Sequence, residues 1–417
     1  MDMDAGCSGA DGRKSISAAE ARRIILGRVG PLAGWERVAI RAALGRILAE
    51  DVVAPCNVPA HDNSAMDGYA VRADDLQADG DVTLQVVGTA LAGRGFSGLV
   101  GPGQAVRIMT GGVMPAGADT IVVQEVARRD GSVIVVPPGI RRGQNVRRAG
   151  EDLAEGAVAL PRGKLIGPAE LGLVASLGLA EVSVHRRLRV AFFSTGDELA
   201  SIGRPLASGE VYDSNRYTLY GALAKLGCDI VDMGVVPDQP EALETAFRNA
   251  AACADVVLTT GGVSVGEADF IRALMQRLGE VSFWKIDIKP GRPMAFGRIG
   301  NTWMFGLPGN PVAVLVTYYQ FVVDALLKIA GLDPLPERPL TRVICSEAIR
   351  KLANRREFLR GRLFEEAGEW KVRPAGKQGS GILRSMSEAN CFIVLDEKQG
   401  DVAAGDAVHV QLFDGLV

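Results

Sequence analysis

The feature that most constrains the fold is an alternation of short apolar runs and helical segments between residues 187 and 332. Apolar runs at residues 190–193, 229–236 and 256–258 each lead into a loop, and helices of about 10–15 residues are expected between them. Because such nearly continuous apolar strands are buried on both faces, the pattern predicts a doubly wound, mostly parallel sheet covered by helices. Ligands of these sheets bind beyond the carboxyl ends of the strands.

The loop after the third apolar run, residues 258–272, combines glycines with carboxylates. Gly261 and Gly262, with Ser264 close behind, would let backbone N–H groups approach an anion at the start of the next helix. Two acids, one of them Asp269, would repel a bare phosphate, so the loop predicts a phosphate together with a divalent cation such as Mg²⁺. The alternative is an ordinary strand-to-helix loop whose acids only cap the helix.

Charged residues of both signs are expected along the same edge of the sheet. They are Asp197, Glu198, Asp238, Lys285, Lys289 and Arg292. Lys289 precedes a Pro-Gly turn that would hold its charge in place, which makes it the strongest phosphate candidate. Helix capping and surface ion pairs are the simpler alternative for the set. Pro308 and Pro311 could begin a helix or form a floor against a ligand ring.

The chain of 417 residues is too long for one core, and its patterns divide it into several units. We expect a disordered tail (1–14), a discontinuous linking or dimerisation unit (15–54 with 153–186), an inserted small β domain (55–152), the α/β unit (187–332) and a C-terminal β-barrel (333–417). The linking unit begins with a capping box at Ser17 and Glu20, and a second helix is expected over residues 40–50.

Composition excludes several classes of protein. The net charge of -3 gives no general attraction to nucleic acid or anionic membranes. Six scattered cysteines and three histidines argue against a disulfide framework or a zinc site and fit a reducing cytoplasm. We find no signal peptide, Rossmann fingerprint, Walker A loop or Ser-His-Asp arrangement. The apolar run 311–327 falls short of the ~20 residues that a membrane-spanning helix needs.

The expected β insert also carries polar clusters. Asp67 lies in a stretch of short polar residues, and Asp152 follows two arginines. The sequence Thr110-Gly111-Gly112 ends a strand, so its backbone N–H groups could hold an oxyanion. Each cluster taken alone is more simply explained as a turn.

Nine motifs resemble, in order, those of one known family. They are DNSAMDGYAV (62–71), RIMTGG (107–112), GQNVRRAGED (143–152), FSTGDEL (193–199), YDSNRY (212–217), TGGVSVGEADF (260–270), KPGRPMAFG (289–297), GLPGNPV (306–312) and GKQGSGILRSMSEAN (376–390). Nearly the whole chain after the acidic tail therefore resembles the MoeA family of molybdopterin molybdenumtransferases, which is related to the C-terminal part of gephyrin.

The resemblance implies an inserted β domain, an adenylyltransferase-like α/β domain and a C-terminal barrel, in an elongated homodimer. It implies a late step of molybdenum cofactor synthesis, in which adenylylated molybdopterin and molybdate give the loaded cofactor and AMP with the help of Mg²⁺. The expected partners are the preceding adenylyltransferase and the enzymes that receive the cofactor, with no nucleic acid or membrane.

The matching motifs also imply site residues. Asp67, Thr110 and Asp152 would form the inserted domain's face of the cleft; Glu198, Asp238 and Asp269 would be acidic and Lys285 and Lys289 basic residues of the α/β domain; Arg360 and Ser380 would come from the barrel. On this basis Asp238 and Asp269 are the expected Mg²⁺ ligands, and molybdate is expected at the N–H groups of Thr110-Gly111-Gly112.

Two other functions fit part of the pattern. A molybdopterin adenylyltransferase shares the α/β domain, but its single-domain build leaves the β insert and barrel unexplained. A non-catalytic, gephyrin-like scaffold would not need the acidic and glycine positions, all of which are present. Net adenylylation of molybdopterin by ATP would favour the first, and binding of a membrane receptor without AMP release would favour the second.

Overall fold

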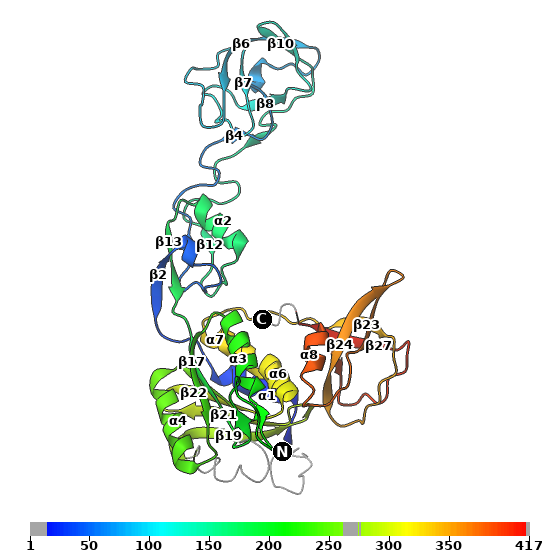
Figure 1. The fold of residues 1–417 in the computed structure, drawn as a ribbon. Coiled ribbons are helices and arrows are strands. Elements are labelled where there is room, and N and C mark those ends of the chain that lie inside the picture. Colours follow the sequence, from blue (N-terminus) through cyan, green and yellow to red (C-terminus); the bar gives the residue numbers. More distant parts are fainter. Residues whose placement is uncertain (1–14, 262–273, 275–276, 414–417) are drawn as a thin grey trace, which may run out of the picture.

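The chain forms an elongated molecule in which separate units follow one another (Figure 1). The computed structural model describes residues 15–261, 274 and 277–413. The expected tail over residues 1–14 lies outside the described residues, and so do Gly262, Ser264 and Asp269. One end of the molecule is the β insert, a small linking unit follows, and the α/β unit and the barrel lie together at the other end.

The α/β unit is built on a seven-stranded sheet. Its strands, in spatial order, are β1 (Ser15–Ile16), β19 (Gly279–Ile286), β21 (Pro293–Ile299), β22 (Thr302–Leu307), β18 (Val256–Thr260), β14 (Arg189–Thr195) and β17 (Asp229–Val236). All neighbours are parallel except at β21, so the predicted mostly parallel sheet is confirmed. Strand β21 is antiparallel because only Gly300 and Asn301 separate it from β22, which is too short for a crossover.

Helices cover both faces of this sheet. On one face lie α1 (Ala18–Arg28), α3 (Ser214–Lys225), α6 (Pro311–Thr317) and α7 (Val323–Ile329); α4 (Pro240–Cys253) packs on the other. Successive residues of β14 point to opposite faces of the sheet. Phe192 packs in the core under α1, α3, α6 and α7, and Phe193 contacts Phe247 of α4 with ring centroids 5.1 Å apart.

The longest helical run, Pro311–Ile329, is a core element. A π-helical turn (Tyr318–Val322) joins α6 to α7 within it. By length and composition this run, with a mean hydropathy of 1.6, could cross a membrane, but 78% of it is buried inside the protein. Its apolar side chains therefore have protein partners.

The first described segment differs from its predicted place. Residues 15–28 were expected in the linking unit, but β1 pairs with β19 and Ile25 of α1 lies in the core of the α/β unit. The apolar side of α1 is buried by α7 rather than by the linking strands.

The linking unit contains two antiparallel strand pairs, each formed by segments far apart in sequence, and one α-helix. Strand β2 (Trp35–Ala39) pairs with β13 (Glu181–His185), β3 (Val52–Val53) pairs with β12 (Val158–Leu160), and α2 (Pro168–Ser176) packs beside them. The helix predicted over residues 40–50 is wrong: only a 3₁₀ turn, Ile40–Ala42, forms. Gly45 has φ +73°, and the N–H groups of Gly45 and Leu48 donate to Ile166 and Lys164 instead of along a helix.

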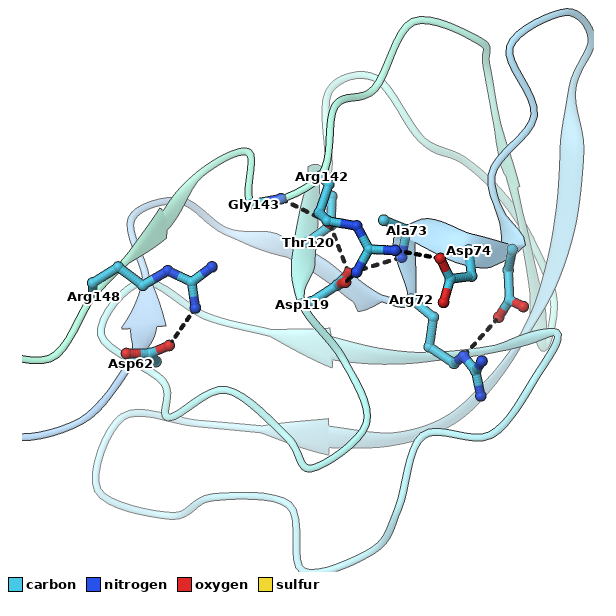
Figure 2. A network of polar contacts seen from close by, with 10 residues as sticks. Asp62, Arg72, Ala73, Asp74, Asp119, Thr120, Arg142, Gly143 and Arg148 are labelled. Atoms are coloured by element: carbon cyan, nitrogen blue, oxygen red, sulfur yellow. Dashed lines mark hydrogen bonds and ion pairs between the residues drawn. The ribbon is translucent and has the colours of Figure 1, made fainter.

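The β insert forms its own sheet, as its alternating pattern predicts. The order is β8 (Thr120–Val123), β5 (Gly68–Val71), β7 (Gln104–Ile108), β6 (Val82–Ala90), β10 (Val133–Val136) and β9 (Arg128–Asp130), with a separate pair β4 (Asn63–Ser64) and β11 (Val146–Arg147). Figure 2 shows how the Arg142 guanidinium contacts Asp74 and Asp119, which ties the loop before β11 to the 3₁₀ turn after β5 and to the start of β8.

The C-terminal unit is a closed barrel of five strands, which confirms the prediction. These are β23 (Thr341–Cys345), β24 (Arg356–Glu366), β25 (Glu369–Pro374), β26 (Cys391–Leu395) and β27 (Ala407–Leu412), and β24 pairs with β26 to close the ring. A short helix, α8 (Arg384–Glu388), lies beside β24. Strand β20 (Ile288–Lys289) of the α/β unit adds to β24, so the two units share a ladder.

Candidate active site

A cleft of about 670 Å³ opens at the carboxyl ends of the parallel strands. The loops after β14, β17, β18 and β22 line it, together with the turn after β20 and two segments of the barrel, one before β24 and one after β25. Seven predicted site residues line the cleft: Glu198, Asp238, Gly261, Lys289, Arg292, Pro308 and Ser380. Residues from segments far apart in the chain meet because parallel strands end at the same edge of a sheet.

The turn after β18 requires glycine at position 261, because a side chain there would clash with the neighbouring backbone. Gly261 has φ +89°, and a Cβ atom there would lie 2.4 Å from the carbonyl oxygen of Thr195. Gly309, in the turn after β22, also faces this point, where an added Cβ would be 3.8 Å from the Gly261 Cα. Two backbones therefore approach each other closely at the cleft floor, which leaves room for a ligand above them.

An acidic wall follows β14 and β17. The Glu198 carboxylate lies against Gly196, where a Cβ would be 2.7 Å from it. Its backbone carbonyl accepts the N–H of Val211 at 2.9 Å, in the short pairing of β15 (Leu199–Ala200) with β16 (Val211–Tyr212). The backbone N–H of Asp238 donates to the Asp197 carboxylate at 3.3 Å. This wall brings carboxylates of two separate loops to the same cleft.

The acidic wall can supply part of a magnesium site. Within the described part of the chain, no three acidic, histidine or cysteine side chains group closely enough to hold a metal ion by themselves. Mg²⁺ usually takes only one or two carboxylates and completes its shell with water and substrate phosphate. Glu198 and Asp238 fit that donor chemistry, whereas Asp269 lies outside the described residues.

The cleft also has basic residues in its lining. Lys289 Nζ lies 3.3 Å from both carboxylate oxygens of Glu357. The Arg292 guanidinium is 3.7 Å from Asp287. Lys285 lies on β19, opposite Ser15, and is not among the residues that line the cleft. Lys289 and Arg292 thus bring positive charge to the same cleft as the carboxylates of Glu198 and Asp238.

Arg360 supports the barrel wall instead of lining the cleft. Its side chain is 1% exposed, and it donates to Ser385 Oγ at 2.9 Å and to the Gly379 carbonyl at 3.1 Å. Burial lowers the pKa of Arg360 to about 10, so the guanidinium stays charged at neutral pH. The loop that it holds carries Gln378 and Ser380 into the cleft, and the Ser380 carbonyl accepts the N–H of Val312 at 3.0 Å. Pro311 begins α6 at this point.

Asp67 and Thr110 form a pair in the β insert. The Asp67 carboxylate accepts the backbone N–H and the hydroxyl of Thr110, both at 2.8 Å. These two bonds, the backbone bond first, lower the pKa of Asp67 below its ordinary value. The predicted oxyanion site at the glycines is wrong, because their N–H groups are already used: Thr110 donates to Asp67, Gly111 to Ser64 and Gly112 to Met109.

The β insert is not brought to the cleft of its own chain. Figure 1 shows the linking unit between the two. Asp152 lies where the insert joins the linking unit, and its N–H donates to Val58. Nearby, the Asp62 carboxylate accepts the Arg148 guanidinium (Figure 2). It also accepts the backbone N–H of Ala149. The predicted residues therefore divide into a group around the cleft and a group on the insert.

Several cleft residues were not predicted. Asn215, Arg355 and Gln378 line the cleft. Asn215 is 7% exposed, and its amide donates to the Gly309 carbonyl at 2.7 Å, while among the described residues its Oδ1 has no hydrogen-bond partner. Asn215 and Gln378 lie in motifs that resemble those of the family, so the motifs could have indicated them as site residues. Arg355 lies in no such motif.

A cleft at the carboxyl edge of a doubly wound sheet, lined by glycine turns, carboxylates and cations, is typical of an α/β protein that has its ligand site at this edge. Models of known families match the units around it: the MoeA N-terminal region (domain I and II) over residues 16–178, a probable molybdopterin binding domain over 191–328, and the MoeA C-terminal region (domain IV) over 342–413.

Relatives match this chain over 90% of its length or more. The molybdopterin molybdenumtransferase of Haemophilus influenzae is 44% identical over 384 residues, which cover 92% of this chain and 95% of that protein. That of Nostoc sp. is 36% identical over 90% of this chain and 88% of its own length. The chain therefore belongs to the MoeA family of molybdopterin molybdenumtransferases, which are transferases of molybdenum cofactor biosynthesis.

Solved structures agree with this assignment. The crystal structure of the molybdopterin biosynthesis moeA protein from Pyrococcus horikoshii OT3 superimposes with a TM-score of 0.82 at 30% identity, and covers 96% of this chain and 100% of that one. A second moeA structure from the same organism gives a TM-score of 0.77 at 32% identity. The arrangement of the four units is thus shared with solved members of the family.

Proposed function

We propose that this chain converts adenylylated molybdopterin and molybdate into the molybdenum-loaded cofactor and AMP. The observation that carries the proposal is one cleft lined by the close backbone turns at Gly261 and Gly309, by the cations Lys289 and Arg292 and by the carboxylates Glu198 and Asp238. A close backbone approach and two cations suit a phosphate, and carboxylates in the same cleft suit a metal ion or a proton transfer.

In this proposal each wall has a task. Lys289 and Arg292 hold the phosphates that join the pterin to AMP and balance the charge that develops when the phosphoanhydride breaks. Glu198 or Asp238 accepts the proton of the attacking water. The two dithiolene sulfurs of the substrate bind molybdenum in place of one molybdate oxygen, which leaves as water with the two protons of the dithiol. The reaction therefore needs no cysteine of the protein.

Magnesium is part of the proposal. Asp238 would hold it together with substrate phosphate, with Glu198 close by and with Asp269 as the second ligand implied by the family resemblance. When bound, Mg²⁺ would neutralise phosphate charge beyond what the two cations supply. A titration with Mg²⁺ that leaves AMP release unchanged, after removal of all divalent ions by a chelator, would contradict this role.

We also propose a homodimer in which the β insert of one protomer completes the cleft of its partner. Support comes from the distance that the linking unit puts between the Asp67–Thr110 pair and the cleft of the same chain (Figure 1). The location we propose is the cytoplasm, and the partners are the preceding adenylyltransferase and the enzymes that receive the cofactor.

The test is incubation of the purified chain with adenylylated molybdopterin, Mg²⁺ and molybdate, with tungstate in a parallel sample. Molybdate-dependent release of AMP together with formation of the loaded cofactor is the expected result. Net adenylylation of molybdopterin from ATP, with no molybdate-dependent step, would contradict the proposal and assign the chain to the preceding reaction.

A further inference from the structure

An ion pair joins the cleft to the barrel. Lys289 is the last residue of β20, and Glu357 is the second residue of β24; the two strands pair in parallel with these residues in register. Lys289 Nζ lies 3.3 Å from both carboxylate oxygens of Glu357. The lysine side chain is 58% exposed, whereas that of Glu357 is only 5% exposed.

The two partners differ in their relation to the cleft. Lys289 lines the cleft, and Glu357 lies behind it and is not a lining residue. A buried carboxylate requires a charged or hydrogen-bonding partner, and within the described part of the chain Lys289 is the one recorded for its side chain. Glu357 therefore acts on the cleft only through the lysine.

Lys289 has little freedom apart from its side chain. The next residues are Pro290 and Gly291; Gly291 has φ +98°, and a Cβ there would lie 2.7 Å from Thr317 Cγ2. The backbone of Lys289 itself is held in the ladder with β24. In that ladder, the N–H of Arg356, the residue before Glu357, donates to the Asp287 carbonyl at 3.0 Å. Only the four-carbon side chain of Lys289 remains free to change conformation, and the Glu357 carboxylate holds the ammonium at its end.

The pair leaves donor capacity for a ligand. A lysine ammonium has three N–H donors, and two carboxylate oxygens can take at most two of them. At least one N–H therefore remains for a ligand in the cleft that Lys289 lines. Held in this way, the ammonium offers a donor of fixed direction instead of a mobile charge.

We propose that Glu357 is a positioning residue for the reaction: from the barrel, it holds the Lys289 ammonium at the cleft wall in the orientation that receives the substrate phosphate. This inference rests on the proposed function, since it takes the ligand of Lys289 to be the phosphate of the adenylylated pterin. It also gives the C-terminal barrel a part in substrate binding through strand β24.

The experiment compares Glu357→Gln, Glu357→Asp, Lys289→Gln and the double variant Glu357→Gln/Lys289→Gln. We expect kcat/KM for AMP release to fall about 100-fold in Lys289→Gln and about 10-fold in Glu357→Gln, mainly through KM. Glu357→Asp keeps the charge and should recover part of the loss. The double variant should match Lys289→Gln within about 2-fold, because residues that act as one unit are not additive.

Glu366→Gln is the matched control. Glu366 lies at the other end of β24 and pairs with Lys371 on the barrel surface at 2.9 Å, so its loss should leave kinetics unchanged. A Glu357→Gln enzyme with wild-type KM, or a double variant in which the two losses multiply, would overturn the inference.

A binding measurement separates this inference from the proposed function. Calorimetry with AMP as the probe should show about 10-fold weaker binding to Glu357→Gln than to the wild-type chain, whether or not turnover occurs. Absence of AMP release by the wild-type chain would overturn the proposed function alone. Equal AMP affinity of the wild-type and Glu357→Gln chains would overturn the positioning role.

Discussion

The cleft of the α/β unit and the polar pair of the β insert are built in opposite ways. The cleft collects residues from several loops and from the barrel, so that Glu198, Lys289 and Ser380 meet although they are far apart in sequence. In the insert, Asp67 and Thr110 satisfy each other within one sheet, and the glycine N–H groups beside them are already used. The first region therefore offers a concave surface of mixed charge, whereas the second presents a carboxylate that is already hydrogen-bonded.

This difference assigns different tasks to the two regions. The cleft has cations and close backbone approaches that suit a phosphate, so changes there should affect ligand binding. The insert contributes a carboxylate whose geometry is set before any ligand arrives, so changes there should affect turnover and leave the binding of AMP unaltered. Four predictions test this division, in order of decreasing effect.

Gly261→Ala should have the largest effect. The added Cβ would lie 2.4 Å from the Thr195 carbonyl at a residue with φ +89°, so the floor of the cleft must move. We expect kcat/KM to fall about 100-fold and the free energy of unfolding to fall by about 1–3 kcal/mol. Kinetics and denaturant unfolding measure the two effects. Gly221→Ala in α3, where a Cβ meets nothing within 4 Å, is the control and should keep full activity.

Asp67→Asn should abolish most turnover without weakening ligand binding. We expect AMP release to fall about 100-fold, because the asparagine keeps the shape of the side chain but loses its charge. AMP affinity, measured by calorimetry, should remain that of the wild-type chain. If Asp67→Asn weakened AMP binding as much as it slowed AMP release, the assignment of binding to the cleft and of turnover to the insert would be wrong.

Arg360→Lys should have an intermediate effect. The lysine cannot replace the bonds to Ser385 and to the carbonyl of Gly379, so the loop that carries Ser380 should loosen. We expect about a 10-fold loss in kcat/KM and about 1–3 kcal/mol of stability. The exposed Arg342→Lys on β23 is the control, and comparable losses in both variants would contradict the supporting role of Arg360.

Thr110→Val should have the smallest effect, and it concerns pH. The Thr110 backbone N–H and hydroxyl lower the pKa of Asp67, so the pair contributes stability above the ordinary carboxyl pKa of about 3.9 and loses it as pH falls through the lowered value. Removal of the hydroxyl should raise the Asp67 pKa part of the way back, as measured by NMR titration. The pKa of Asp62, held by Arg148 and Ala149, should not move.

Regular patterns account for what could be predicted from the sequence. The strands of the sheet, the insert and the barrel follow from apolar runs between turn residues, and cleft residues such as Asp238 and Lys289 follow from their place at strand ends. The prediction of a helix over residues 40–50 was wrong because tertiary hydrogen bonds at Gly45 outweigh the helix propensity of this segment.

Long-range pairings account for what could not be predicted. Nothing local indicates that β1 joins β19, since the two are far apart in sequence. The pair of Lys289 with Glu357 is likewise set by the meeting of two units. The oxyanion site at Gly111 and Gly112 failed for a similar reason: the sequence shows the donors, and only the structure shows that Ser64 and Met109 accept from them.

The proposal that the β insert of one protomer completes the cleft of its partner is tested most directly by a heterodimer. It contains one Asp67→Asn protomer and one Lys289→Gln protomer and is purified by two different tags. If the insert of one protomer completes the cleft of the other, one of the two clefts is wild-type in both regions, and the other carries both changes. The account predicts about half of the wild-type rate of AMP release from the heterodimer, although each homodimer is nearly inactive. A heterodimer as inactive as either homodimer would contradict it.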